Sequence, residues 1–321
     1  MKIIVTGATG RFARDALPLL LQTIAPEDLI LVTRNPASLA ALVAKGITVR
    51  AGDFDQPETL GPAFAGGDRM LMISTRDVGR RAEQHERAIN AARSVGVGHI
   101  VYTSSDGAHP NNPAAIAPDH MRTETLLMES GLDFTIMRDS LYADSGAFGM
   151  TPTALASGQW RTAAAEGRVG FVPRPECVAC AVTVLTGEGH AGKIYRIANE
   201  KNWSLRELAA MASEIFERPI EYVSLTVAER DAELAAAGLP PHYVPGLNTL
   251  AFGASARDDI VSYEHGIRGG FFQTTSQDVR TLLCRPPADM RDFLIKNRDT
   301  VMARAKQLAS ADNIFAQINA S

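Results

Sequence analysis

A glycine-rich turn separates the first apolar segment of the chain from the first helical pattern. The run Ile3–Thr6 is apolar enough for a buried parallel strand, which is covered on both faces. Two glycines follow within four residues, and apolar residues with helical spacing begin at Phe12. A turn of this kind brings backbone N–H groups and the positive end of a helix to a dinucleotide diphosphate. The context therefore predicts a cofactor site formed by Gly7, Ala8, Thr9, Gly10, Arg11 and Phe12.

The residue after the second predicted strand indicates which dinucleotide fits. Leu29–Thr33 is apolar and is followed by Arg34, with no acidic residue beside it. An acidic side chain there would bind the ribose 2′-hydroxyl, whereas an arginine pairs with a 2′-phosphate. We therefore expect NADPH rather than NADH, the alternative being that Arg34 is a solvated surface residue. Asp53, after the third strand, is expected either to contact the adenine or to serve as a turn or N-cap residue.

Composition narrows the class of protein. The 321 residues suffice for one large domain, or for a main domain with a smaller lobe. A net charge of −4 and a pI near 6.0 argue against nucleic-acid partners and anionic membrane surfaces. No apolar stretch is long enough to span a membrane, and Met1 leads straight into the first strand, so we expect no membrane segment and a cytoplasmic location.

Three cysteines do not make a disulfide framework. Cys177 and Cys180 have the spacing of a redox pair or of half a zinc site, but there is no second pair. Their apolar neighbours favour small core residues on a buried helix face. No metal site is therefore expected.

Strand and helix patterns alternate through the N-terminal part, which predicts an α/β fold with a Rossmann-type, doubly wound parallel sheet. Helices are clearest at 80–95 and 119–130. The expected strands are Ile3–Thr6, Leu29–Thr33, Ile47–Ala51, Arg69–Ile73, His99–Thr103 and Asp133–Met137.

After Arg138 the pattern is less regular and predicts a smaller C-terminal α/β substrate lobe. Helices are expected at 178–185 and 204–216, strands at 195–198 and 220–224, a loop-bearing stretch at 238–270, and a charged helix from about Pro287. We expect an NADPH-binding Rossmann domain at 1–140, to which later segments return, a mixed substrate-binding lobe at 141–297, and a C-terminal helical extension at 298–321. The extension would either dock on a neighbouring subunit of a homo-oligomer or form a solvated amphipathic helix.

Polar residues follow three of the central strands. Ser74, Thr75 and Arg76 come after the fourth strand, Ser104–Asp106 after the fifth and Arg138–Tyr142 after the sixth. Ligands of such sheets bind outside the carboxyl ends of the strands, so all three segments should line one site. Ser and Asp also favour turns, which is the alternative, and it is stronger for Ser105 and Asp106 than for Ser74 and Thr75.

The usual acid of short-chain dehydrogenases is a tyrosine four residues before a lysine. None of the six tyrosines has that spacing, and no lysine occurs between Lys45 and Lys193. The ordinary alcohol dehydrogenase mechanism is therefore excluded, together with that of ordinary sugar-nucleotide epimerases.

With these motifs the chain resembles the NmrA-like, atypical short-chain dehydrogenase/reductase family, most closely its NADPH:quinone oxidoreductase and triphenylmethane reductase branch. The resemblance extends to about Asn297. The matching segments are 5–10, 32–36, 73–79, 101–104, 119–124, 192–195, 203–209 and 269–272.

The resemblance implies an NADPH-binding domain with a lobe that closes over a small-molecule acceptor. Residues 7–12 would hold the diphosphate, Arg34 the 2′-phosphate, and residues 74–76 the nicotinamide-side ribose and phosphates. We assign Arg138 to the cofactor as well. His120 stands where related members carry a catalytic or cofactor-holding lysine, so His120 and Tyr142 are the catalytic candidates. A lone histidine is also often a satisfied structural residue.

Hydride transfer to a quinone or a cationic dye needs no strong general acid, which suits a reductase without the Tyr–Lys pair. We expect Asp139, Leu141, Tyr142 and Phe148 to contact the acceptor. The branch usually has Asn-Gly-Trp-Tyr where this chain has residues 139–142, so quinone specificity does not carry over directly. Two alternatives stay open. One is a non-catalytic NmrA-type dinucleotide redox sensor that acts through a protein partner, and the other is a reductase of a specific conjugated aldehyde or ketone metabolite.

Overall fold

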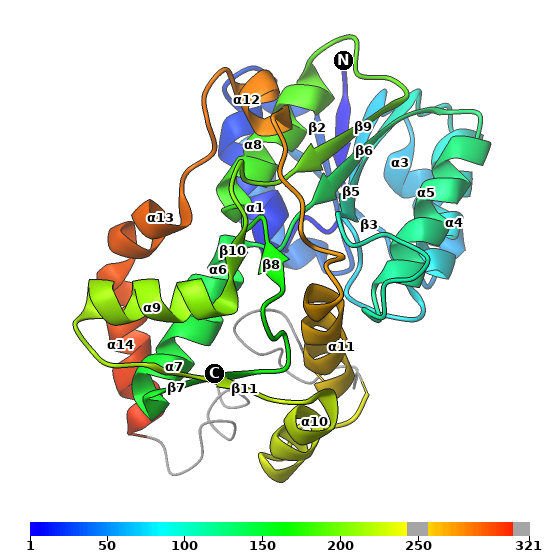
Figure 1. Ribbon diagram of the computed structural model, residues 1–321. Coiled ribbons are helices and arrows are strands. Elements are labelled where there is room, and N and C mark those ends of the chain that lie inside the picture. Colours follow the sequence, from blue (N-terminus) through cyan, green and yellow to red (C-terminus); the bar gives the residue numbers. More distant parts are fainter. Residues whose placement is uncertain (243–255, 311–321) are drawn as a thin grey trace.

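A seven-stranded sheet is the centre of the computed structural model, which describes residues 1–242 and 256–310. Its order is β3-β2-β1-β4-β5-β6-β9, and every pairing in it is parallel. The order runs outward in both directions from the centre, which confirms the predicted doubly wound sheet (Figure 1). The strands are β1 (Ile3–Val5), β2 (Leu29–Thr33), β3 (Thr48–Ala51), β4 (Arg69–Met72), β5 (His99–Ser105), β6 (Asp133–Asp139) and β9 (Lys193–Ile197).

Helices cover both faces of this sheet (Figure 1). One face carries α1 (Arg11–Leu20), α8 (Arg174–Thr186) and α12 (Asp278–Leu283), and the other carries α3 (Leu60–Phe64), α4 (Arg81–Ser94) and α5 (Ala117–Glu129). Strand residues alternate between the two cores: Ile3 and Val5 pack toward α1, whereas Ile4 packs toward α3. The short remaining elements of this half are η1 (Pro26–Asp28), η2 (Pro36–Leu39), α2 (Ala40–Val43) and η3 (Pro57–Thr59).

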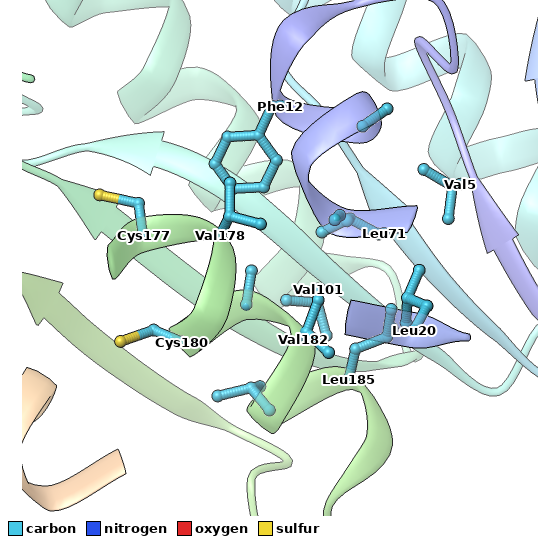
Figure 2. Packing of buried hydrophobic residues seen from close by; sticks show 14 of the residues in the cluster. Val5, Phe12, Leu20, Leu71, Val101, Cys177, Val178, Cys180, Val182 and Leu185 are labelled. Carbon is cyan, nitrogen blue, oxygen red and sulfur yellow. The ribbon is translucent and has the colours of Figure 1, made fainter. Parts of the chain in front are cut away.

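Cys177 and Cys180 lie in the core between the sheet and α8, beside Phe12 and Val178 (Figure 2). Both are free, fully buried thiols. Their interpretation as small core residues is confirmed. Within residues 1–242 and 256–310, no group of three or more His, Cys, Asp or Glu side chains is placed to hold a metal ion.

The strands next to the predicted site are longer than expected. β5 continues to Ser105 and β6 to Asp139, and these two residues are partners in the sheet register. β6 also pairs with β9, so its last residues have a neighbour on each side. This pairing between distant segments keeps polar residues in extended conformation, which local sequence preference alone would end earlier.

The second half forms a lobe around its own apolar core, which includes Trp160, Phe171 and Phe272. Two small sheets belong to it. β7 (Gln159–Thr162) runs parallel to β11 (Glu221–Ser224), and β8 (Arg168–Val169) pairs antiparallel with β10 (Trp203–Ser204). The helices are α6 (Ala143–Ser145), the π-helix η4 (Gly146–Met150), α7 (Thr151–Ser157), α9 (Leu205–Phe216), α10 (Val227–Ala236), α11 (Arg257–Arg268), α13 (Met290–Lys296) and α14 (Arg298–Ala309).

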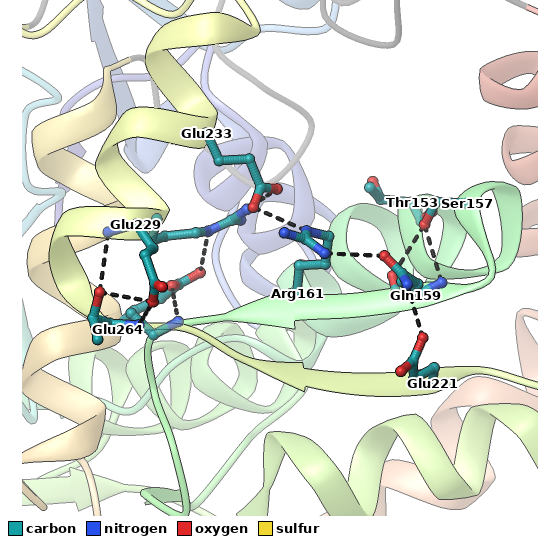
Figure 3. Close-up of polar contacts among 11 residues, drawn as sticks. Thr153, Ser157, Gln159, Arg161, Glu221, Glu229, Glu233 and Glu264 are labelled. Atoms are coloured by element: carbon teal, nitrogen blue, oxygen red, sulfur yellow. Dashed lines mark hydrogen bonds and ion pairs between the residues drawn. The ribbon is translucent and has the colours of Figure 1, made fainter.

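A polar network fixes α10 and α11 against β7 (Figure 3). Arg230 pairs with Glu233 at 3.0 Å and with the buried Glu264 at 3.3 Å. Glu264 also accepts a hydrogen bond from the Ala163 amide, and Arg161 of β7 pairs with Glu233 at 2.9 Å. Burial raises the pKa of Glu264, and Arg230 opposes that shift. These contacts hold α10 and α11 against the sheet formed by β7 and β11.

Two expectations for the C-terminal part were wrong. Within 238–270, residues 257–268 form the helix α11 rather than a loop, while 243–255 lie outside the described residues. The single helix expected from about Pro287 is divided at Asn297, whose side-chain amide donates to the Phe293 carbonyl and ends α13. The following helix, α14, packs against α7 of the same chain and buries Val301 and other apolar residues.

None of the helices in the described part of the chain is long and apolar enough to cross a membrane.

Candidate cofactor and acceptor site

The glycine turn after β1 is tightly folded. Gly7 has a φ of +59°, a left-handed conformation that side chains disfavour. The Gly10 amide donates to the Gly7 carbonyl at 2.8 Å, and a Cβ atom on Gly10 would lie 3.1 Å from that oxygen. Gly10 is the N-cap of α1 and offers no side-chain acceptor to the first helical amides. The turn therefore presents N–H groups without side-chain partners, an arrangement that fits an anionic diphosphate.

Phe12 and Ala13 serve packing at the start of α1. Phe12 is 7% exposed and points toward α8, so its backbone rather than its ring is what it can offer to a cofactor (Figure 2). Ala13 replaces the third glycine of the dinucleotide fingerprint and is buried in the same core. Its small side chain allows the close contact of helix and strand that this position needs. Arg11, in contrast, is exposed.

Arg34 directly follows β2 at the carboxyl edge of the sheet. The residue is exposed, and its guanidinium has neither a hydrogen bond nor an ion pair with any described residue. Asp53 lies beyond β3, and its Oδ1 accepts a hydrogen bond from the Asp55 amide at 3.0 Å. That contact is the turn role given above as the alternative for Asp53. Arg34 is thus available to an anion, whereas one oxygen of Asp53 is already used.

The segment that leaves β4 is held by hydroxyl groups of neighbouring strands. The Ile73 amide donates to Thr6 Oγ1 at 3.0 Å, and the Ser74 amide donates to Thr103 Oγ1 at 2.9 Å. Ser74 and Thr75 are half-buried and Arg76 is exposed. The structure therefore brings residues 74–76 to the same sheet edge as the glycine turn and Arg34.

His120 lies inside a buried hydrogen-bond network rather than at an open surface. Its Nε2 is 2.8 Å from Arg81 Nη1, and its Nδ1 is 2.8 Å from Tyr102 Oη. Arginine can only donate, so Nε2 accepts and the proton sits on Nδ1, which donates to Tyr102. Burial, with Arg81 and His85 nearby, lowers the pKa of His120 well below its usual value. The ring is neutral, 4% exposed, and engaged at both nitrogens, as expected of a satisfied structural histidine.

Arg138 is engaged by a buried carboxylate. Its Nε and Nη2 lie 2.9 Å and 2.5 Å from the two oxygens of Glu124 on α5, and Ser104 also donates to Glu124 at 2.6 Å. The ion pair raises the pKa of Arg138. Two guanidinium nitrogens, Nε and Nη2, are therefore already bonded to Glu124, so Nη1 is the nitrogen that could contact a cofactor. Glu124 thereby connects α5 to the ends of β5 and β6.

Ser105, the last residue of β5, makes a turn contact of the kind that was its alternative role. The Gly107 amide donates to Ser105 Oγ at 3.2 Å. The fully buried Asp106 side chain has Arg196 of β9 3.5 Å away. Burial raises the pKa of Asp106, and Thr274 and Arg196 oppose the shift.

Asp139 and Tyr142 form a hydrogen-bonded pair at the end of β6. Tyr142 Oη donates to Asp139 Oδ2 at 2.9 Å, and the Cys177 thiol also contacts this carboxylate. Asp139 is 7% exposed, and burial raises its pKa to about 7. Burial, with Asp139 beside it, raises the pKa of Tyr142 well above its usual value. The Asp139 carboxylate therefore faces protein groups.

Leu141, Tyr142 and Phe148 occupy the segment that joins the two halves of the molecule. Tyr142 packs against the core between the sheet and α8, whereas Leu141 and Phe148 pack against the core of the lobe. All three are half-buried, so each retains surface that a ligand could cover.

The residues that hold this site together were not singled out from the sequence. Arg81, Gln84 and His85 are buried polar residues on one face of α4, and each contacts Thr75. Gln84 and His85 follow Arg81 by three and four residues, and the same helical spacing continues into the apolar Ala88 and Ile89. Polar side chains in line with the buried face of a helix are the signal that would have identified them.

Comparison with known proteins agrees with this geometry. The sequence profile of a family described as NAD(P)H-binding matches residues 7–162. Quinone oxidoreductase 2 of Escherichia coli (strain K12) is 35% identical over 253 residues, which cover 79% of this chain and 88% of that protein. The chain belongs to the NAD(P)H-binding NmrA-like family.

Solved structures of this family superpose on most of the chain. The NADPH-dependent quinone oxidoreductase of Escherichia coli, complexed with NADPH, has a TM-score of 0.82 at 32% identity and covers 91% of this chain and 98% of its own. The triphenylmethane reductase of a Citrobacter species, complexed with NADP(H), has a TM-score of 0.80 at 29% identity, with coverages of 92% and 99%. These are the two activities that name the branch the sequence resembles, so the expected membership is confirmed.

Proposed function

We propose that the protein is an NADPH-dependent oxidoreductase that transfers hydride to a quinone or to another electron-poor conjugated acceptor. The observation that carries this proposal is the meeting of three features at one edge of the sheet: the glycine turn, the Ser74–Thr75 segment, and Arg34, whose side chain has no partner among the described residues. The similarity to an NADPH-dependent quinone oxidoreductase supports the choice of acceptor class.

Different groups of the chain bind different parts of the cofactor. The first amides of α1 and the exposed Arg11 bind the diphosphate, and Arg34 pairs with the 2′-phosphate. Ser74 and Thr75 hold the ribose on the nicotinamide side. The bound nicotinamide supplies the hydride, and the protein supplies orientation and an environment with little water. We assign the acceptor to the half-buried surfaces of Leu141, Tyr142 and Phe148.

The lack of a strong acid in the site limits the kind of acceptor that it can reduce. No Tyr–Lys pair exists, and His120 has no free nitrogen, so the site has no strong acid of the usual kind. Reduction of a simple ketone would form an alkoxide and would need one. A quinone instead spreads the negative charge of the reduced product over its conjugated system, and water can complete the protonation. The site therefore favours acceptors that stabilise their own reduced form.

Tyr142 can donate a hydrogen bond to the acceptor when Asp139 is protonated. While Asp139 is ionised, the tyrosine hydrogen points to the carboxylate. When Asp139 is protonated, its own O–H can donate to Tyr142 Oη, which frees the tyrosine hydrogen for an acceptor oxygen. A pKa of about 7 for Asp139 makes both states available near neutral pH.

A panel of acceptors tests the proposal. NADPH oxidation would be followed at constant cofactor with a benzoquinone, a cationic triphenylmethane dye, an α,β-unsaturated aldehyde and a simple ketone. We expect turnover with the quinone, and a rate with the simple ketone no greater than without an acceptor. Tight NADPH binding with no turnover on any member of the panel would contradict the proposal and favour the redox sensor. Turnover of the unsaturated aldehyde alone would favour the reductase of a specific metabolite.

A further inference from the structure

Thr75 is held at all three of its polar groups by one turn of α4. Its amide donates to His85 Nε2 at 3.1 Å, its carbonyl accepts from Arg81 Nε at 2.6 Å, and its hydroxyl donates to Gln84 Oε1 at 2.6 Å. Because the backbone and the side chain are both fixed, Thr75 has no freedom to turn without breaking a hydrogen bond. This leaves the Ser74–Thr75 segment rigid although it lies outside any strand or helix.

The hydrogen bonds around His85 allow one position for its proton. The Thr75 amide can only donate, so His85 Nε2 must accept and Nδ1 must carry the hydrogen. His85 Nδ1 lies 3.0 Å from Thr123 Oγ1, and the Thr123 hydroxyl in turn donates to the Asp119 carbonyl at 2.8 Å. The result is a directed chain of hydrogen bonds from the Thr75 amide to α5.

His85 itself is too deeply buried to touch a ligand. The residue is fully buried, and its ring packs edge-on against Tyr102 with 5.2 Å between ring centroids. The ring of Phe54 lies 6.2 Å away in a similar edge-on arrangement. Any effect of His85 on a ligand must therefore pass through the residues that it contacts, and of these Thr75 lies at the predicted cofactor edge.

We propose that His85 is a positioning residue, which, as a neutral imidazole protonated at Nδ1, fixes the Thr75 amide and thereby the Ser74–Thr75 segment beside the nicotinamide ribose. This inference rests on the proposed function, because it assigns that segment to the cofactor. Small displacements of groups that orient a reacting ring have large effects on rate, whereas the proposed phosphate contacts at the glycine turn and Arg34 lie away from His85 and are left in place. Loss of the His85 acceptor should therefore lower kcat more than it weakens NADPH binding.

Two substitutions of similar size separate positioning from packing. In His85→Gln, the amide oxygen takes the place of Nε2 and can still accept from Thr75. In His85→Asn, the shorter side chain replaces only Nδ1 and leaves the Thr75 amide without an acceptor. His99→Gln is the matched control, because His99 is also a buried histidine of this half, bonded to Thr135 at 2.9 Å, but it lies at the opposite end of β5 from the site.

The experiment measures kcat with a quinone, the dissociation constant of NADPH, and hydrogen exchange of the Thr75 amide in the cofactor-free protein. We expect His85→Asn to lower kcat about 10-fold or more, to change NADPH affinity about 2-fold at most, and to speed exchange of the Thr75 amide. His85→Gln should restore most of kcat and the slow exchange, and His99→Gln should alter neither.

Equal kcat and equal exchange in the Asn and Gln variants would overturn the inference. If the unmodified protein binds NADPH but reduces no acceptor, the proposed function fails, and the exchange measurement alone still decides whether His85 fixes the Thr75 amide.

Discussion

Tyr142 donates its hydroxyl hydrogen to Asp139, with 2.9 Å between Oη and Oδ2, at the point where the chain leaves the sheet for the lobe. Burial raises the pKa of Asp139 to about 7. An unfolded aspartate ionises near pH 4, so folding favours the protonated form of this group. Protonation of Asp139 near neutral pH therefore affects the stability of the fold. It also decides whether the Tyr142 hydroxyl hydrogen points to Asp139 or away from it.

The stability effect has a definite sign. Between about pH 4 and pH 7 the folded protein holds a proton on Asp139 that the unfolded chain has lost, so this group destabilises the fold increasingly as pH rises. We expect the unfolding free energy of Asp139→Asn, relative to the unmodified protein, to increase across that range by up to about 1.4 kcal/mol per pH unit and to level off above pH 7. Urea unfolding at several pH values measures it. Glu58→Gln, at an exposed site, is the control, and a difference for Asp139→Asn that does not vary with pH would refute the expectation.

Arg34→Ala should discriminate between the two dinucleotides. The side chain is exposed and without a partner among the described residues, so its removal disturbs no internal contact. A lost charge-assisted contact to the 2′-phosphate should raise the KM for NADPH about 10- to 100-fold and leave that for NADH almost unchanged. Steady-state kinetics with both cofactors checks this, with Arg93→Ala at the far end of α4 as control. Equal increases for NADPH and NADH would mean that Arg34 does not bind the phosphate.

Glu124→Ala should destabilise the protein strongly. The Glu124 side chain is 5% exposed and accepts from both Arg138 and Ser104, so its removal leaves a largely buried guanidinium without its counter-ion. We expect a loss of about 3 kcal/mol in the free energy of unfolding, measured by urea titration. Glu166→Ala breaks the exposed ion pair with Arg206 and should have a far smaller effect. Similar losses of unfolding free energy in the two variants would show that the burial of Glu124 does not account for its effect on stability.

His120→Gln should retain most of the activity. A glutamine oxygen can replace Nε2 as the acceptor for Arg81, and neither nitrogen of the native ring is free for an acceptor molecule. We expect kcat to stay within about 3-fold of that of the unmodified protein. The pH–rate profile should keep the same limbs in both proteins. General acids typically contribute at least about 100-fold, so a loss of that size would instead identify His120 as a catalytic residue.

The sheet could be predicted from the sequence because its signals are local. Short apolar runs separated by helical spacing identify the strands, and the glycine turn before Phe12 identifies the cofactor edge. Helix α11 was missed because only four of its twelve residues are apolar and because glycine and proline are frequent around it. The surroundings of His120 depend on Arg81 and Tyr102, which come from other elements, and no spacing along one segment encodes such a meeting. The same holds for the ion pair of Glu124 with Arg138.

The position of β9 has a consequence for how the protein is made. β9 completes the sheet beside β6, yet the first elements of the lobe, from α6 to β8, are translated between the two strands, followed by α8. Until Lys193–Ile197 leaves the ribosome, those backbone amides and carbonyls between Thr135 and Asp139 that face β9 lack their native partners, whereas those that face β5 are already paired. Unpaired strand edges are templates for association with other chains. A fragment that ends at residue 140 contains the predicted nucleotide-binding motifs but leaves the β9-facing edge of β6 unpaired. We therefore expect this fragment to aggregate, whereas a chain that extends past β9 should not.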